Sequence, residues 1–141
     1  MQSTPGSNSG TSAVRRIQLS SFTDESTGSE LFVLNPIQLE GYTFCRFFYF
    51  SGTDSGQVRG NHAHRQCVQL LIPMEDGVQM HFFSRNGEEA VIPSLRGEAV
   101  LVPPMVWVKL KFLKESPALL VAATEGYSEK DYIRSESEFF Y

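Results

Sequence analysis

Two histidines, His62 and His64, stand two positions apart in a segment that has the composition of a β-strand. Side chains at this spacing project from the same face of a strand, so both imidazoles should reach the same space. The chain has three histidines in 141 residues, which makes a chance pair on a solvated surface the weaker interpretation. An imidazole, with an ordinary pKa of about 6.5, can take up and return a proton near neutral pH or bind a metal. The pair therefore indicates a site for one of these two chemistries.

The residues around the pair resemble the two metal-binding motifs of cupin barrels, but two metal ligands are missing. In cupins a His-x-His pair precedes a glutamate, and a later glycine and proline, separated by five residues, precede a third histidine. Here Gly97 and Pro103 keep the spacing, whereas Gln69 and Val108 stand at ligand positions. A transition metal needs three or four ligands such as imidazoles and carboxylates. We therefore expect no metal and no other cofactor.

Four segments carry a wider resemblance: Arg46–Tyr49, Arg59–Arg65 followed by Gln69–Ile72, Val102–Trp107, and Tyr127–Arg134. In this order they are similar to the motifs of the dTDP-4-keto-6-deoxyglucose 3,4-ketoisomerases, the WxcM-like sugar ketoisomerase cupins. The resemblance covers roughly residues 15–141. It implies an all-β fold with a single cupin-type β-barrel, or jelly roll, and a nucleotide sugar as substrate.

A 3,4-ketoisomerase moves a carbonyl to the neighbouring carbon by proton transfer through an enediol, which calls for a base near neutral pKa. The resemblance implies that His62 and His64 transfer the protons, with His62 as the base at C3. Tyr49 is the third expected catalytic residue and would donate a hydrogen bond to a sugar oxygen. An arginine fork suits a diphosphate or an enediolate, an amide can orient an imidazole, and an indole can stack on a base or sugar. The expected substrate-binding residues are Arg59, Arg46, Gln69 and Trp107.

Three positions depart from the motifs of that family. Thr27 replaces an arginine, Phe48 replaces a tyrosine, and Val108 replaces a histidine. Each change removes a polar group from the expected region of the site. A non-catalytic or divergent nucleotide-sugar-binding cupin is therefore a second hypothesis, and a metal-dependent cupin enzyme is a third.

Length and charge exclude other classes of protein. A chain of 141 residues is suited to one domain, and its net charge of −4 argues against nucleic acid or an anionic membrane as a partner. The longest apolar runs, such as 118–123, are too short to span a bilayer. Residues 1–13, rich in Ser, Gly and Thr, are expected to be a disordered lead-in without a signal peptide. Residues 14–141 would then form the cupin domain.

The remaining expectations concern location and assembly. Cys45 and Cys67 are the two cysteines of the chain, and free thiols fit a cytoplasmic protein. Barrels of the resembling family associate through sheet edges, and an open edge is an aggregation hazard. We therefore expect a homodimer with a small nucleotide sugar as its ligand.

The elements that position these side chains are short β-rich runs. Turn residues separate these runs at regular intervals, which is typical of an all-β protein. An Asn-Gly pair at 86–87 favours a hairpin with a type I′ turn. Evenly spaced strands in one domain predict a closed barrel, whose interior can receive a small ligand. The predicted strands are Arg16–Leu19, Leu31–Asn35, Phe44–Phe50, Asn61–Ile72, Val78–Ser84, Glu89–Ile92, Ala99–Val102, Val106–Phe112 and Ala118–Thr124.

Overall fold

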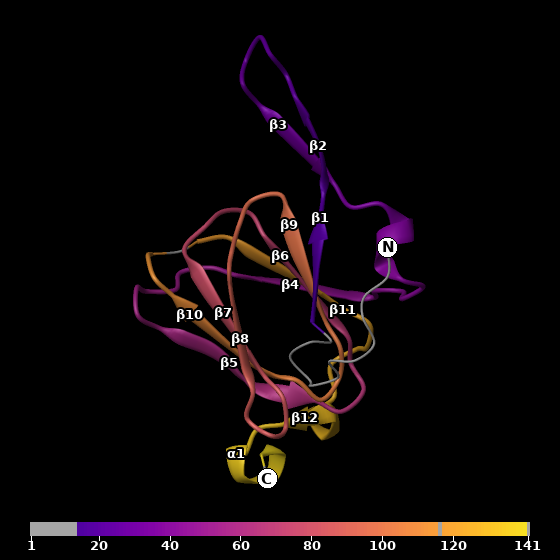
Figure 1. Ribbon diagram of the computed structural model, residues 1–141, viewed down its shortest axis with the longest axis vertical. Helices are drawn as coiled ribbons and strands as arrows, with labels where there is room; N and C mark the ends of the chain where they lie inside the picture. Colours follow the sequence, from indigo (N-terminus) through magenta and orange to yellow (C-terminus); the bar gives the residue numbers. More distant parts are fainter. Residues whose placement is uncertain (1–13, 116, 141) are drawn as a thin grey trace.

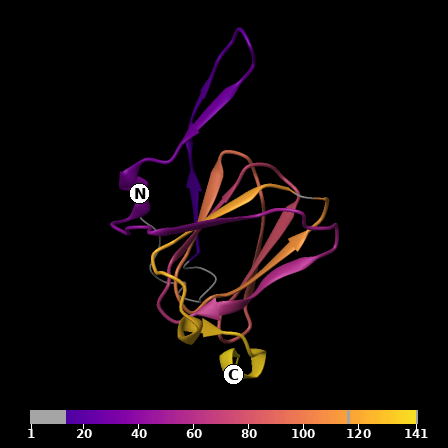
Figure 2. The same ribbon diagram turned by 180° about the vertical axis from the view of Figure 1, so that it is seen from behind.

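This computed structural model describes residues 14–115 and 117–140, which contain twelve β-strands. Ten of them form two five-stranded antiparallel sheets that face each other as a barrel (Figures 1 and 2). The predicted all-β barrel is thus confirmed. The predicted lead-in, residues 1–13, lies outside the described residues.

The first sheet holds, in spatial order, β1 (Arg15–Gln18), β9 (Glu98–Val102), β6 (Gln69–Pro73), β11 (Leu119–Ala123) and β4 (Arg46–Phe50). The second sheet holds β12 (Tyr132–Ile133), β5 (Val58–His64), β10 (Trp107–Phe112), β7 (Val78–Phe83) and β8 (Glu89–Pro93). A two-stranded hairpin of β2 (Ser20–Thr23) and β3 (Glu30–Val33) projects from the barrel (Figure 1). Three short helices complete the fold: η1 (Pro36–Leu39), η2 (Glu129–Asp131) and α1 (Glu136–Phe139).

Alternating side chains divide the apolar residues among three clusters. The main core lies between the two sheets, because its members come from strands of both, among them Leu71, Phe82, Val108 and Val121. The second cluster covers the outer face of the first sheet and includes Leu70. The third lies on the outer face of the second sheet, where residues of β5, β10 and β12 meet α1. Both faces of each sheet are therefore covered in part, and the barrel interior keeps room for a site at one end.

Two local predictions need correction. The run Asn61–Ile72, predicted as one strand, is interrupted after His64, and its halves enter different sheets as β5 and β6. The β7–β8 hairpin forms as expected, but its turn is longer than a two-residue type I′ turn. A type I′ turn needs positive φ at both central residues, whereas Gly87 has a φ of 91° and Asn86 does not have a positive φ.

No helix in the described segments has the length and apolar character needed to cross a bilayer.

Candidate active site

A pocket of about 470 Å³ opens at one end of the barrel, where β4, β5 and β6 meet the segment around β12. A much smaller cavity, of about 30 Å³, continues below it into the apolar core. The pocket therefore joins a polar mouth to an apolar floor. Its lining residues are Phe48, Tyr49, Phe50, Ser51, Arg59, Gly60, His62, Gln69, Tyr132 and Arg134.

A β-bulge in β5 turns Arg59 and His62 to the same side, although three positions separate them. Leu110 and Val108, both in the core between the sheets, pair with Arg59 and His62, respectively. The two intervening residues of β5 have φ values of 79° and 61°, so one extra residue is accommodated there. A Cβ on Gly60 would lie 3.1 Å from the carbonyl oxygen of Val108, in a conformation that favours glycine. The bulge thus brings a guanidinium and an imidazole to one pocket.

His62 lines the pocket with its imidazole held by the backbone of its own strand. Its Nδ1 lies 2.9 Å from the carbonyl oxygen of Gly60. A carbonyl can only accept, so Nδ1 carries the hydrogen and Nε2 is the basic nitrogen. Burial, and then the neighbouring His64, lower the pKa of His62 to about 4. The imidazole is therefore neutral at physiological pH and able to accept a proton.

His64 is buried behind His62 and is held by a carboxylate. Its Nδ1 lies 2.8 Å from Oδ2 of Asp131, and the two imidazole rings are 5.1 Å apart, edge to face. The Nε2 atom of His64 is buried and has no hydrogen-bond partner within the described residues. Burial lowers the pKa of His64, while the hydrogen bond and charge of Asp131 oppose that shift. Both predicted catalytic histidines thus lie together, but in different electrostatic surroundings.

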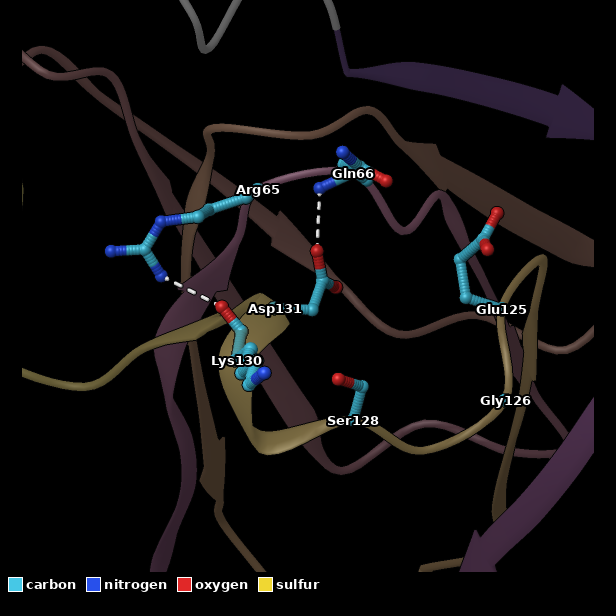
Figure 3. Close-up of a pocket in the computed structure, with 7 residues that line it drawn as sticks. All are labelled: Arg65, Gln66, Glu125, Gly126, Ser128, Lys130 and Asp131. Atoms are coloured by element: carbon cyan, nitrogen blue, oxygen red, sulfur yellow. Dashed lines mark hydrogen bonds between the residues drawn. The ribbon is translucent and has the colours of Figure 1, made fainter.

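Asp131 is fixed by the turn that separates β5 from β6. Its Oδ1 accepts the backbone N–H of Gln66 at 2.7 Å (Figure 3), and its Oδ2 accepts that of Cys67 at 3.3 Å. Burial opposes ionisation of Asp131, but the bonds from His64 and from the two N–H groups outweigh it and lower the pKa. A second cavity, of about 320 Å³, borders the same aspartate (Figure 3). Asp131 is therefore an ionised acceptor for a histidine distant in sequence.

Tyr132 covers both histidines. Its ring centroid lies 4.9 Å from that of His62 and 4.4 Å from that of His64. The guanidinium of Arg134 lies 4.2 Å from the Tyr132 ring and donates to Glu129 at 2.6 and 3.1 Å. This pairing helps to lower the pKa of Glu129 to about 2. The segment 129–134 therefore forms one wall of the pocket.

Three arginines lie at this end of the barrel, one of which, Arg134, is paired with Glu129. Arg59 and Arg134 line the pocket, and Arg46 lies beside its wall residue Phe48, with the guanidinium carbon 5.4 Å from that ring. The guanidinium of Arg59 lies 5.2 Å from the ring of Phe50. Stacking on a ring leaves the N–H groups at the edge of a guanidinium available to an anion. Such an arrangement suits a phosphorylated ligand.

Gln69 and Tyr49 take different places around the pocket. Gln69 is buried, points to the barrel interior, and has no side-chain hydrogen bond among the described residues. Its amide is therefore available to a ligand. Tyr49 is 73% exposed and projects to the opposite side of β4 from Phe48 and Phe50. It belongs to the outer rim of the pocket, so its role as a donor to the sugar stays a prediction.

The prediction that Trp107 binds substrate is corrected by its burial. Trp107 is fully buried on the outer face of the second sheet, where it packs against Phe139 and Phe140 at centroid distances of 5.5 and 5.6 Å. Its Nε1 donates to Oδ1 of Asn61 at 3.0 Å. Side chains alternate along a strand, and the neighbouring Val108 faces the interior, so Trp107 faces outward. Trp107 therefore stabilises the covering of the sheet and is not accessible to a ligand.

The positions that depart from the family motifs lie in two places. Phe48 and Val108 both face the small apolar cavity beneath His62. Thr27 lies in the loop between β2 and β3, on the hairpin that projects from the barrel (Figure 1), and is not among the residues that line the pocket. Of the three polar losses, those at Phe48 and Val108 affect the pocket of this chain.

The residues do not fit the metal site of a cupin. Val108 pairs directly with His62 and contributes only a buried aliphatic side chain there. Another group, made of His64, Cys67 and Asp131, has ligand atoms within 4.8 Å of one another. The Asp131 oxygens of that group already accept three hydrogen bonds. The side chains around His62 therefore do not suit a metal ion of the cupin kind.

Asp131, Tyr132 and Arg134 belong to the site, although no role was predicted for them from the sequence. All three belong to the segment Tyr127–Arg134, which the motif comparison singled out without giving it a role. An acidic residue and an arginine in a segment with a strong family likeness were the signals available. The contacts of Asp131 and Tyr132 with the histidines span more than sixty positions, so spacing alone could not pair them.

Comparisons with known proteins place the chain among nucleotide-sugar enzymes. The model of a family described as WxcM-like, C-terminal (FdtA) matches residues 12–141. A curated relative, the TDP-4-oxo-6-deoxy-alpha-D-glucose-3,4-oxoisomerase of Aneurinibacillus thermoaerophilus, is 24% identical over 98 residues, which cover 70% of each chain.

Solved structures share the fold. The 3,4-ketoisomerase QdtA of Thermoanaerobacterium thermosaccharolyticum in complex with TDP has a TM-score of 0.79 and 27% identity, over 89% of this chain and 90% of that one. A histidine-to-asparagine mutant of QdtA in complex with TDP-4-keto-6-deoxyglucose gives 0.79 and 26%, with the same coverage. A 3,4-ketoisomerase from Helicobacter canadensis gives 0.80 at 23% identity, over 89% and 93%, a likeness of fold.

Proposed function

This chain belongs to the WxcM-like, C-terminal (FdtA) family, and from that membership we propose that it is a nucleotide-sugar 3,4-ketoisomerase. Its proposed substrate is a dTDP-4-keto-6-deoxyhexose, by analogy with relatives named for that activity. The observation that carries the proposal is the neutral imidazole of His62 in a pocket bordered by arginines, with the imidazole of His64 packed behind it at 5.1 Å. The enzyme is an intramolecular oxidoreductase, because it only redistributes hydrogen within the sugar.

His62 is the proposed base. It takes the proton from C3, next to the C4 ketone, and the C4 oxygen gains a proton, which gives an enediol. Loss of the proton on the C3 oxygen and return of one to C4 leave the carbonyl at C3. The Nε2 atom of His62 is unprotonated and its pKa of about 4 keeps it neutral. A bound diphosphate would raise that pKa towards the working pH, because an anion favours the imidazolium.

The remaining polar groups position the substrate in this proposal. Arg59 and Arg46 bind the diphosphate or the enediolate through bidentate N–H donors. Gln69, whose amide has no other described partner, binds a sugar oxygen, and Tyr49 donates to another at the rim. Remote binding energy from the nucleotide orients the small reacting ring against the base.

The proposed chemistry requires no metal and no other cofactor. Proton transfer by imidazoles supplies about 10²–10⁴-fold in rate, and the donor set around His62 does not suit a transition metal. We expect substoichiometric zinc, iron, nickel and manganese by elemental analysis, and unchanged turnover after treatment with a chelator. One equivalent of tightly bound transition metal would contradict this part of the proposal.

A second candidate function is binding without turnover. It is favoured by Phe48 and Val108, which present apolar side chains to the floor of the pocket where the resembling family has polar ones. In that case the nucleotide sugar would bind and the carbonyl would not move.

One experiment separates the two functions. The protein is mixed with dTDP-4-keto-6-deoxyglucose in deuterated water, and the sugar is followed by NMR. An isomerase produces the 3-keto sugar with deuterium at C4. Binding of dTDP without exchange of solvent deuterium into the sugar would establish the binding function instead.

We also propose that the protein is a homodimer. The β2–β3 hairpin extends from the barrel (Figure 2) and carries Phe22 and Leu31, each 61% exposed. Apolar side chains on a projecting hairpin are well suited to cover a second copy. Sedimentation at micromolar concentration should give twice the mass of the 15.8 kDa chain, and a single species at the monomer mass would exclude the dimer. A cytoplasmic location stays a prediction, consistent with the free thiols of Cys45 and Cys67.

A further inference from the structure

We propose that Asp131 is a positioning residue of the isomerase: it holds His64 in the tautomer whose Nε2 is free to exchange a proton. The inference rests on the proposed function for its catalytic meaning. Asp131 does not line the main pocket, so it would act through His64 and not on the sugar.

The first support is the geometry of the hydrogen bond. Oδ2 of Asp131 lies 2.8 Å from Nδ1 of His64. An ionised carboxylate has no hydrogen to donate, so the hydrogen of this bond belongs to Nδ1. In a neutral imidazole the other nitrogen, Nε2, must then carry a lone pair and act as a base.

The second support is that the carboxylate cannot easily turn away. Its two oxygens also accept the backbone N–H groups of Gln66 and Cys67, and the backbone of Tyr132, the next residue, pairs with that of His64. The aspartate is thus anchored to the strand that carries the histidine and to the turn that follows. Preorganisation of this kind keeps a catalytic group within a fraction of an ångström of its working position.

The third support is the state of Nε2 itself. It is buried and lacks a hydrogen-bond partner within the described residues, which is costly for a polar atom unless a ligand supplies the bond. His62 and Tyr132 pack on the same imidazole. His64 does not itself line the pocket, so a ligand group would reach Nε2 past His62 and Tyr132, which do.

The contrast with His62 indicates what Asp131 adds. The Nδ1 of His62 donates to a neutral carbonyl, that of Gly60, whereas the Nδ1 of His64 donates to a charged carboxylate. A carboxylate stabilises an imidazolium much more than a carbonyl does. During turnover His64 is therefore the imidazole better able to hold a proton for a time.

The test compares Asp131→Asn with a control that loosens the same segment. An asparagine can turn its N–H₂ group towards Nδ1 of His64. The hydrogen of that imidazole would then move to Nε2, and Nε2 could no longer accept a proton. We expect kcat to fall by about 10²–10⁴-fold, with dTDP affinity and KM within about threefold of wild type. Asp131→Glu, which keeps the charge, should recover part of kcat.

Arg65→Ala is the matched control. Arg65 donates to the carbonyls of Lys130 and Tyr132 and to Glu138, so it tethers the same segment without contacting His64. This variant should keep kcat within about threefold of wild type. An equal loss in Arg65→Ala and Asp131→Asn would mean that Asp131 has only a structural role.

The tautomer is read directly from the ¹⁵N spectrum of the histidine side chains in the free protein. Wild type should show a protonated Nδ1 on His64, and Asp131→Asn a protonated Nε2. A protonated Nε2 in wild type, or full activity of Asp131→Asn beside an active wild type, would overturn the inference. If wild type isomerises no keto sugar but shows the expected change of tautomer, the proposed function fails and the placement of the hydrogen stands.

Discussion

The two faces of β5 carry residues of one short motif in opposite environments. On the inner face, Arg59 and His62 line a pocket, and His64 is buried behind His62 with its Nε2 lacking a partner among the described residues. On the outer face, Ala63 is fully buried beneath the residues around α1, and Asn61 accepts a hydrogen bond from the indole of a buried tryptophan. The inner face thus leaves polar atoms unsatisfied, whereas the outer face is closed and packed.

This difference shows how one strand can support both function and stability. A buried polar atom without a hydrogen-bond partner destabilises the folded state, whereas close packing of large apolar side chains stabilises it. The packing of Trp107 and Phe139 on the outer face therefore helps to offset the cost of the histidines on the inner face. Substitutions on the two faces should consequently affect different properties.

The largest effect is expected from the inner face. His62→Asn keeps a polar side chain of similar reach but removes the base, so kcat should fall by about 10²-fold or more, while folding and dTDP binding are retained. Turnover is measured by NMR and affinity by calorimetry. Activity equal to that of wild type would show that another group is the base.

The outer face should show the opposite response. Trp107→Phe removes the hydrogen bond to Asn61 and leaves a small void beside Phe139, which should lower the free energy of unfolding by about 1–3 kcal/mol. Turnover per folded molecule should stay within about twofold. Urea denaturation measures the free energy of unfolding, and an activity assay under conditions well below the unfolding transition measures the turnover. A loss of turnover with unchanged stability would bring Trp107 back into the site.

A smaller effect is expected at the pocket wall. Arg59→Lys keeps the charge but loses the planar fork of donors, so dTDP affinity should fall by about tenfold, equivalent to about 1.4 kcal/mol. Arg96→Lys is the matched control, because Arg96 pairs with Glu30 at the surface. Equal affinities for the two variants in calorimetry would remove Arg59 from the anion site.

A further effect concerns pH and sharpens the comparison of the faces. The pKa of His62 is about 4 in the folded protein and about 6.5 in an unfolded chain. Between these values the unfolded state binds more protons, so stability is greatest above about pH 6.5 and decreases as the pH falls towards 4. The free energy of unfolding at pH 5 and pH 7 should therefore differ more in wild type than in His62→Asn. An identical difference in both proteins would contradict the lowered pKa.

Several features followed from local chemistry and could be predicted. Alternation on a strand placed His62 and His64 on one face, and the residue types at Gln69 and Val108 excluded the ligand set of a cupin metal site. The turn residues and short apolar runs gave the all-β barrel. All of these features depend on residues near one another in the chain, so their periodicity and chemistry can be recognised from the sequence.

Long-range contacts and local irregularities required the tertiary structure. The bulge after Arg59 shifted the alternation by one residue, and the packing around α1 decided that Trp107 faces away from the site. The partnership of His64 with Asp131 joins residues 67 positions apart, and no periodicity links such a pair. The residue types of the motif identify the side chains that could transfer a proton. Which nitrogen of each imidazole carries the hydrogen follows from the fold, because that depends on the acceptor that folding brings to the ring.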